Sequence, residues 1–310
     1  MRIPATPYRL SIHQLTGHWR RNCIGLLASA ALAGSMPAQA AFTVFEATGT
    51  DPVSITAARD GLRSAIGGGT TAAAHGDFGG LRREINWDGV PDARTDPNLL
   101  PGDFFNTTSP RGAVLGTPGS GFLVSANSGG AVPDLFGFPG DLQAFSAQKL
   151  FGIVGSNTMD IRFFVPGTNT AATTSAFGAV FVDLENNDAV DFTTMRFFDR
   201  NDNEIFSRTV LATNVTRSLS FLGAVANAGE QIARVTITTP NNYLLANGIR
   251  LNETHDFVIM DDFIYATPAA VPEPGIWAML LVGTGLLAWR ARRLNSRAAP
   301  AASRTARLRG

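Results

Sequence analysis

The sequence predicts an all-β fold: a single domain of the β-sandwich or jelly-roll type, with one short helix near its N-terminus and a transmembrane helix near its C-terminus. Residues Ile232–Thr238 alternate between apolar and polar, as the two-residue period of a half-buried strand requires. Several such runs are separated by Gly, Pro, Asn and Asp, which is typical of an all-β sandwich. With 45% hydrophobic and only 16% charged residues, the chain can build a packed core, which argues against disorder.

The first 40 residues predict a signal peptide. Arg20 and Arg21 precede the apolar run Cys23–Ala33. Ala38 and Ala40 then supply the small-x-small pattern that a signal peptidase accepts, so residue 41 would begin the mature protein. The alternative is a buried helix of a cytoplasmic protein, which fits poorly with a position ahead of any domain and behind a basic segment.

One helix is expected near the start of the body domain, residues 41–268. Asp51 is a suitable N-cap residue, and Pro52 suits the first helical position. The run Gly67–Gly69 predicts the end of this helix. Between them, apolar residues recur at helical spacing at Ile55, Ala58, Leu62 and Ile66.

The rest of the body predicts short strands. Asp256–Tyr265 is apolar on both faces and is expected to be a central strand, and Asp199–Asn203 has the residue types of a hairpin turn. Residues 67–145 are rich in loops but also in aromatic residues, so we expect them to share one core; two domains that meet near residue 145 are the alternative. The other expected strands are Gly121–Ser125, Asp160–Val165, Ala176–Asp183, Thr193–Phe198, Ile205–Leu211 and Ser218–Leu222.

Charge is distributed unevenly along the chain. Residues 41–271 contain 24 acidic and 14 basic residues, a net charge of −10, whereas both ends are basic. Such a body repels phosphate, which excludes nucleic acid as a partner. The single cysteine, Cys23, lies in the predicted signal peptide, so the mature chain is expected to have no disulfide and no thiolate metal site.

Three elements follow one another at the C-terminal end. Val271–Pro274 reads Val-Pro-Glu-Pro, Ile276–Trp289 is an uncharged and mostly apolar run of 14 residues, and arginines stand at 290, 292 and 293. The run is shorter than the roughly 20 residues that a membrane-spanning helix needs, and the arginines favour a cytoplasmic end. We expect a short transmembrane helix here, followed by a basic disordered tail over residues 294–310.

This order of elements resembles the PEP-CTERM sorting tail of Gram-negative bacteria, over residues 269–293. The resemblance implies transient insertion into the inner membrane. It also implies that exosortase, a membrane protease, recognises the sorting motif Pro272, Glu273 and Pro274 and removes the tail. A retained tail anchor is the alternative. The body resembles members of the same class in Leu81–Asp92, Leu99–Gly112 and Val258–Ala266, and this likeness implies no activity.

Few residues of the body indicate chemistry. Its two histidines lack a nearby ligand pattern, and the sequence has no serine-hydrolase elbow, zinc-protease motif or phosphate-binding loop. Asp199, Asn201 and Asn203 copy the first ligand positions of a calcium loop. Glu204 and Val210 stand where that loop needs Gly and Glu, so a plain hairpin turn is the alternative.

Two further groups are candidate sites. Asp261 and Asp262 interrupt an apolar strand and are expected to need a partner, which would be a structural calcium ion, an arginine or a set of backbone donors. No other cofactor is expected. Trp87, Asp88 and Asp92 suggest a glycan contact, in which the ring stacks on a sugar and the carboxylates bind its hydroxyl groups; two carboxylates can also hydrolyse a glycosidic bond. The alternative is a tryptophan buried at an Asp-Gly turn.

The sequence therefore predicts an exported, non-catalytic surface or matrix protein with a structural or adhesive role. The resemblance of its tail implies an association with exopolysaccharide and biofilm, which would make extracellular polysaccharide a partner. A secreted glycan-active hydrolase is the competing class, and a structural subunit that binds only other proteins is a third.

Overall fold

The structure is a computed structural model that describes residues 41–68, 77–78, 80–126, 135–185, 192–245, 248–250, 256–271 and 274–297. All of them belong to one unit of the chain, Ala40–Gly310. Several predicted positions lie outside the described residues: Ala38 and Ala40 of the signal cleavage site, Pro272 and Glu273 of the sorting motif, and the two histidines of the body, His75 and His255.

The larger sheet runs in the order β1-β12-β9-β16-β6-β14-β15, with β5 paired to β6, β3 paired to β16 and β2 paired to β3. Most of its pairs are antiparallel, and β14 and β6 are parallel. Its strands are β1 (Phe42–Gly49), β2 (Asp77–Phe78), β3 (Arg82–Ile85), β5 (Gly121–Val124), β6 (Phe151–Val154), β9 (Ala176–Val182), β12 (Leu219–Ala226), β14 (Tyr243–Leu245), β15 (Gly248–Arg250) and β16 (Ile259–Ala266).

The smaller sheet is antiparallel and runs in the order β11-β10-β13-β7-β4, and β17 pairs with β8 in a separate ribbon. These strands are β4 (Ala113–Gly116), β7 (Thr158–Phe163), β8 (Ala172–Thr173), β10 (Thr194–Phe198), β11 (Glu204–Thr209), β13 (Arg234–Thr238) and β17 (Ala269–Ala270). The helices are α1 (Pro52–Ile66), α2 (Phe104–Thr107) and α3 (Pro274–Arg297), with 3-10 turns η3 (Asp92–Arg94) and η4 (Leu135–Gly137).

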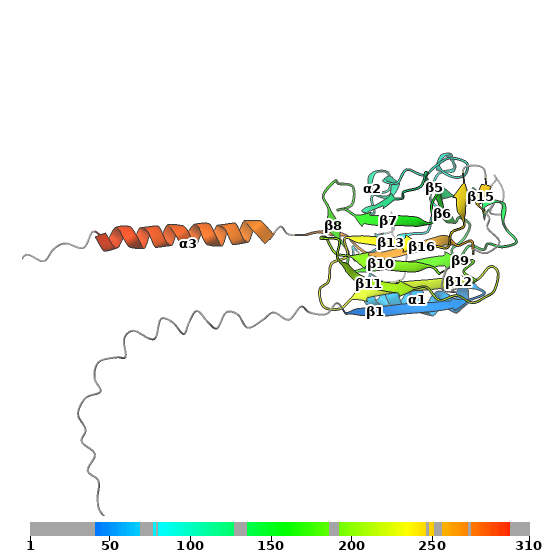
Figure 1. Ribbon diagram of the computed structural model, residues 1–310, viewed down its shortest axis with the longest axis horizontal. Coiled ribbons are helices and arrows are strands. Elements are labelled where there is room, and N and C mark those ends of the chain that lie inside the picture. The colour runs from blue at the N-terminus through cyan, green and yellow to red at the C-terminus, as the bar shows by residue number, and fades with distance from the viewer. Residues whose placement is uncertain are drawn as a thin grey trace, which may run out of the picture. The chain divides into compact units, whose positions relative to one another are not determined.

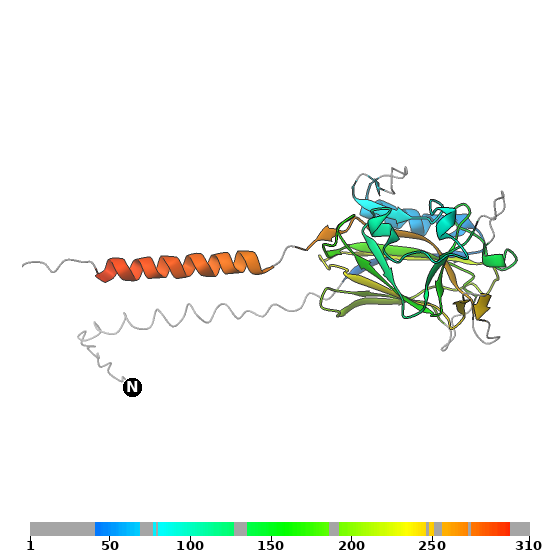
Figure 2. The same ribbon diagram turned by 90° about the horizontal axis from the view of Figure 1, so that it is seen from above.

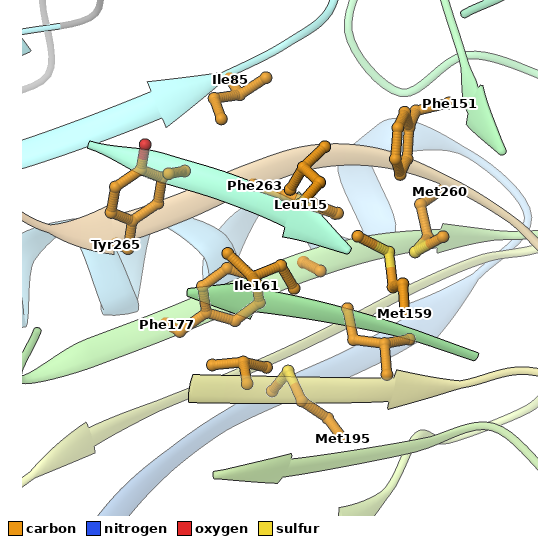
Figure 3. Close-up of a cluster of buried hydrophobic side chains, with 14 of the residues drawn as sticks. Ile85, Leu115, Phe151, Met159, Ile161, Phe177, Met195, Met260, Phe263 and Tyr265 are labelled. Carbon is orange, nitrogen blue, oxygen red and sulfur yellow. The ribbon is translucent and has the colours of Figure 1, made fainter. Parts of the chain in front are cut away.

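The two sheets face each other across the main core (Figures 1 and 2). Alternation of side chains along each strand produces this arrangement: in β7, Met159, Ile161 and Phe163 are buried, while the residues between them face outward. The fold is therefore mostly β-sheet, in a sandwich-like arrangement. Phe177, Met260, Phe263 and Tyr265 of the larger sheet point toward Leu115, Met159, Ile161 and Met195 of the smaller sheet (Figure 3).

Helix α1 covers the opposite face of the larger sheet (Figure 2). Asp51 caps it by accepting a hydrogen bond from the backbone N–H of Ser54 (3.0 Å), and Gly67 ends it at φ 97°. Leu62 of α1 packs over Gly178 in β9 and Gly223 in β12. An added Cβ on either glycine would lie within 3 Å of the Leu62 Cδ2 atom, so both positions need glycine for this close approach.

The structure confirms the mostly β fold, the helix near the start of the body and the predicted strands. It also places the central strand as predicted, since β16 is buried along its whole length and pairs on both sides. Strand β1 was not predicted, because Phe42–Gly49 mixes apolar and polar residues without a strict two-residue period. The aromatic residues Trp87, Phe105 and Phe122 of the loop-rich segment lie in the main core.

Replacing Gly178 with alanine should destabilise the protein, because the new methyl group would meet Leu62, the Gly223 backbone and Phe221 at 3.0 Å or less. Overpacking of this kind costs about 1–3 kcal/mol of unfolding free energy. The matched control is Gly116→Ala, where nothing lies within 4 Å of the added Cβ. Guanidinium denaturation of the two purified variants measures the difference, and equal midpoints would contradict the proposed close packing.

Candidate functional site

Hydrogen bonds attach the chain to the body as far as Ala270, close to the start of the sorting tail. The Ala266 carbonyl accepts a hydrogen bond from the Thr174 hydroxyl (2.7 Å), and the Thr267 N–H donates to the Leu81 carbonyl (2.9 Å). Strand β17 then pairs with β8, so that Ala269 lies opposite Thr173 and Ala270 opposite Ala172. This pairing continues two residues beyond the predicted end of the body domain.

Helix α3 begins at Pro274, the last residue of the sorting motif. It extends to Arg297, four residues into the segment for which a disordered tail was predicted. Within the described residues no helix is both long and apolar enough to cross a membrane, so the predicted transmembrane helix does not meet this criterion. The physical reason is that only 14 uncharged residues separate the start of the predicted span, Ile276, from Arg290.

Two buried aspartates occupy a β-bulge in β16. Met260 pairs with Phe181 of β9 and Phe263 pairs with Ala179, so Asp261 and Asp262 both stand opposite one residue. The Asp261 carboxylate accepts hydrogen bonds from the N–H groups of Phe145 (2.7 Å) and Ser146 (3.2 Å) and from the Ser146 hydroxyl (3.1 Å). These backbone donors are one of the partners that the sequence predicted for this pair.

Asp262 is less well satisfied. Its Oδ1 atom is buried and has no hydrogen-bond partner among the described residues. Burial raises the pKa of Asp262 to about 6; a hydrogen bond from Ser146 and the charge of Arg63 lower it, while the charge of Glu84 raises it. Burial and the neighbouring Asp262 charge also raise the pKa of Asp261 well above its usual value. Ionisation of this buried pair at neutral pH therefore lowers the stability of the folded protein.

The glycan platform predicted at Trp87 is wrong, because this ring lies in the core. Trp87 is only 1% exposed and stacks on Phe151, with ring centroids 4.0 Å apart and planes 6° apart. Its indole N–H donates to the Asp261 carbonyl (3.0 Å), which the bulge leaves available. Trp87 is among the residues that line a hollow of about 200 Å³, and neither Asp88 nor Asp92 lines it. The alternative, a tryptophan buried at an Asp-Gly turn, is confirmed.

Asp88 and Asp92 both contact Lys149. Asp88 accepts a hydrogen bond from the Lys149 backbone N–H (3.0 Å), and its pKa is raised by burial, which outweighs the contacts with Lys149. The buried Lys149 ammonium donates to the Val90 carbonyl (2.6 Å) and lies 3.4 Å from an oxygen of the exposed Asp92. These contacts fasten the turn after β3 to the segment before β6.

The Asp199 carboxylate forms hydrogen bonds within the β10–β11 hairpin turn. Its oxygens accept hydrogen bonds from the backbone N–H groups of Asn201 (2.8 Å) and Asn203 (2.9 Å) and from the Asn203 side chain (3.0 Å). Burial alone would raise its pKa, but the bonds from Asn203 and Asn201 lower it. Across the part of the chain that the structure describes, no group of three or more His, Cys, Asp or Glu side chains is placed to hold a metal ion. Structural calcium stays a prediction.

The outer face of the smaller sheet is polar and was not recognised from the sequence. Threonines form a row across four strands, because Thr194 pairs with both Thr209 and Thr238, and Thr238 pairs with Thr158. The next row contains Ser207, Arg196, Thr236 and Asp160. We call the outward side chains of these two rows, with Arg162 and Arg234, the polar face.

A hollow of about 270 Å³ lies at one side of the polar face. It is lined by residues of β4 and β7, including Thr158, Asp160 and Arg162, and by Pro118. Arg234 is committed to other contacts: it forms ion pairs with Asp160 (3.2 Å) and Asp202 (3.0 Å) and lies 3.8 Å over the Phe198 ring. Arg162 is exposed and is one of the residues that line the hollow. In the sequence, these residues can be recognised only as the polar positions of strands in which apolar and polar residues alternate.

Comparison with known proteins identifies the tail. Residues 270–293 match the PEP-CTERM protein-sorting motif. No curated protein matches the chain. The motif indicates export and exosortase-dependent sorting to the cell surface or extracellular space. It begins at Ala270, the last residue of β17, so the sorting segment and the folded body meet without a linker.

The buried pair predicts that stability falls as pH rises. Asp262 has a pKa of about 6 when folded against about 3.9 when unfolded, so its contribution is lost from about pH 4 to past pH 6, at a cost of about 3 kcal/mol. Asp262→Asn should reduce this slope by its own share, and the remainder belongs to Asp261 and Asp183, whose pKa values burial also raises. Asp199→Asn is the control, because its lowered pKa acts only at more acidic pH. Denaturation midpoints at pH 4.5 and pH 7.5 measure the slope, and an unchanged slope in Asp262→Asn would contradict the assignment.

Inserting Gly-Ser-Gly-Ser between Ala270 and Val271 should speed tail removal. The β17–β8 pairing restrains the chain beside the motif, and each hydrogen bond that must open contributes about 0.5–1.5 kcal/mol. We expect processing to be about two- to tenfold faster, as measured by pulse-chase of the long and short forms. The same insertion after Asp202 is the control, and slower or equal processing would count against a restraint by β17.

Proposed function

We propose that this protein is a non-catalytic surface or matrix component, which is sorted by exosortase after signal peptidase has removed residues 1–40. Its role is structural or adhesive, in contact with the extracellular polysaccharide of a biofilm. The polar face is the observation that carries the adhesive part of this proposal. The sorting motif supports delivery to the compartment in which such a polysaccharide lies.

The chemistry of the polar face suits a glycan. Sugar hydroxyl groups donate and accept hydrogen bonds, and the threonine hydroxyls of β7, β10, β11 and β13 do the same. Asp160 accepts and Arg162 donates beside the hollow, and hydrogen bonds to such charged groups are stronger than those between neutral groups. The face is built on paired strands, so its spacing is set before a ligand arrives.

The competing hydrolase has weaker support. Its predicted carboxylates, Asp88 and Asp92, hold Lys149, and Trp87 is not exposed to stack on a sugar. The raised pKa of Asp88, which burial causes, is the one property that would suit a general acid. The binding experiment below therefore includes an assay for newly released reducing ends.

The exported protein should co-sediment saturably with the exopolysaccharide of the producing strain. Arg162→Ala should weaken this binding about tenfold, since a lost hydrogen bond to a charged group costs about 1.5–3 kcal/mol. Arg94→Ala, which removes an exposed arginine in η3, is the matched control.

Repeating the sedimentation with calcium and with a chelator tests the structural calcium. Loss of binding in chelator would support it. No binding in either condition would overturn the adhesive role, and release of reducing ends would favour the hydrolase.

A further inference from the structure

The first described residue of the chain is held by a carboxylate. The Ala41 N–H donates to Glu230 Oε1 at 2.7 Å, and the Ala228 N–H donates to Glu230 Oε2 at 2.9 Å. On the other side of Ala41, its carbonyl accepts a hydrogen bond from the Asn227 N–H (2.9 Å). The turn after β12 therefore surrounds Ala41 with one carboxylate and one backbone donor.

Signal cleavage would change the chemistry of this nitrogen. Hydrolysis of the peptide bond between Ala40 and Ala41 gives the hydroxyl of water to the Ala40 carbonyl carbon and a hydrogen to the Ala41 nitrogen. The freed amine then takes a proton from solvent, since an α-amino group has a pKa of about 7.7–8.0. The nitrogen that faces Glu230 as a neutral amide thus becomes an ammonium group with three donors.

We propose that Glu230 is a binding site for the α-ammonium group of the processed chain itself, and that signal cleavage thereby strengthens the attachment of β1. This inference rests on the proposed export and on cleavage after Ala40, and it does not depend on polysaccharide binding. The amide N–H of the precursor already donates to an ionised carboxylate, and cleavage adds the attraction between a full positive and a full negative charge, so the same geometry holds the mature chain more firmly than the precursor.

The position of Ala41 makes this attachment useful. Strand β1 lies at the edge of the larger sheet and pairs only with β12 among the described strands. The next residue, Phe42, packs on Phe206 and Phe197 of the smaller sheet, at ring centroid distances of 5.0 and 5.8 Å. Fixing Ala41 therefore fixes a side chain that bridges both sheets, at the end where an edge strand would otherwise fray.

Glu230 is suited to bind a cation. Burial by itself would raise its pKa, but hydrogen bonds from the backbone of Ala41, of Glu230 itself and of Ala228 lower it. The carboxylate is therefore ionised at neutral pH.

The decisive experiment measures the pKa of the Ala41 amine in the exported protein, after N-terminal sequencing has identified the first residue. We expect the chain to begin at Ala41 and its amine to titrate above about 8. In Glu230→Gln the amine should return to about 7.7–8.0. Glu204→Gln, which removes an acid from β11 instead, is the control and should leave the amine unchanged.

A second variant separates the ammonium from a merely structural role of Glu230. Inserting one glycine after Ala40 would make the exported chain begin one residue earlier, so that the Ala41 nitrogen is again an amide. In this extended chain, the loss of melting temperature caused by Glu230→Gln should be about 2 °C smaller than the loss in the mature chain. Three outcomes would overturn the inference: a different first residue, an amine pKa that is equal in wild type and Glu230→Gln, or an equal loss of melting temperature in both backgrounds. None of these outcomes affects the sedimentation with polysaccharide, so the proposed adhesive role is tested separately.

Discussion

In β16, an extra residue places Asp261 and Asp262 opposite a single residue of β9, so that two carboxylates and one spare backbone carbonyl must find partners inside the protein. Trp87 supplies the donor for the Asp261 carbonyl, and the segment Phe145–Ser146 supplies donors for its carboxylate. The charge of Arg63, on α1, acts on Asp262. One irregularity in a central strand thereby ties together three segments that are distant in the sequence.

Such a network specifies the fold at a cost in stability. A buried polar group that is fully bonded favours one arrangement of its neighbours, whereas an unbonded one destabilises all of them. Asp261 belongs to the first kind, because three donors reach its carboxylate. Asp262 lies between the two kinds, because a hydrogen bond from Ser146 reaches it while its Oδ1 atom is buried without a hydrogen-bond partner among the described residues. The raised pKa values of the pair express this cost, which the large apolar cores on both sides of the larger sheet offset.

Elements whose signals are local could be predicted from the sequence. The cap Asp51 and the stop at Gly67 define α1, and the contiguous tail is identified by the order of its own residues. The sites are different, because they depend on register. Nothing in the sequence reveals that threonines of four separate strands align in one row, or that Trp87 is covered by Phe151. The contact between Ala41 and Glu230 joins residues 189 positions apart, beyond any local pattern.

The folded body ends close to the two places where the chain is expected to be processed. Strand β1 begins at Phe42, two residues after the predicted signal cleavage, and β17 ends at Ala270, where the matched sorting motif begins. Proteases bind extended and accessible chain, and residues already paired in a sheet are protected from them. On the proposed processing, the hydrogen bonds of β1 and β17 would direct cleavage to the segments that flank them. If both proposed cuts occur, β1 and β17 lie just inside the two ends of the processed chain.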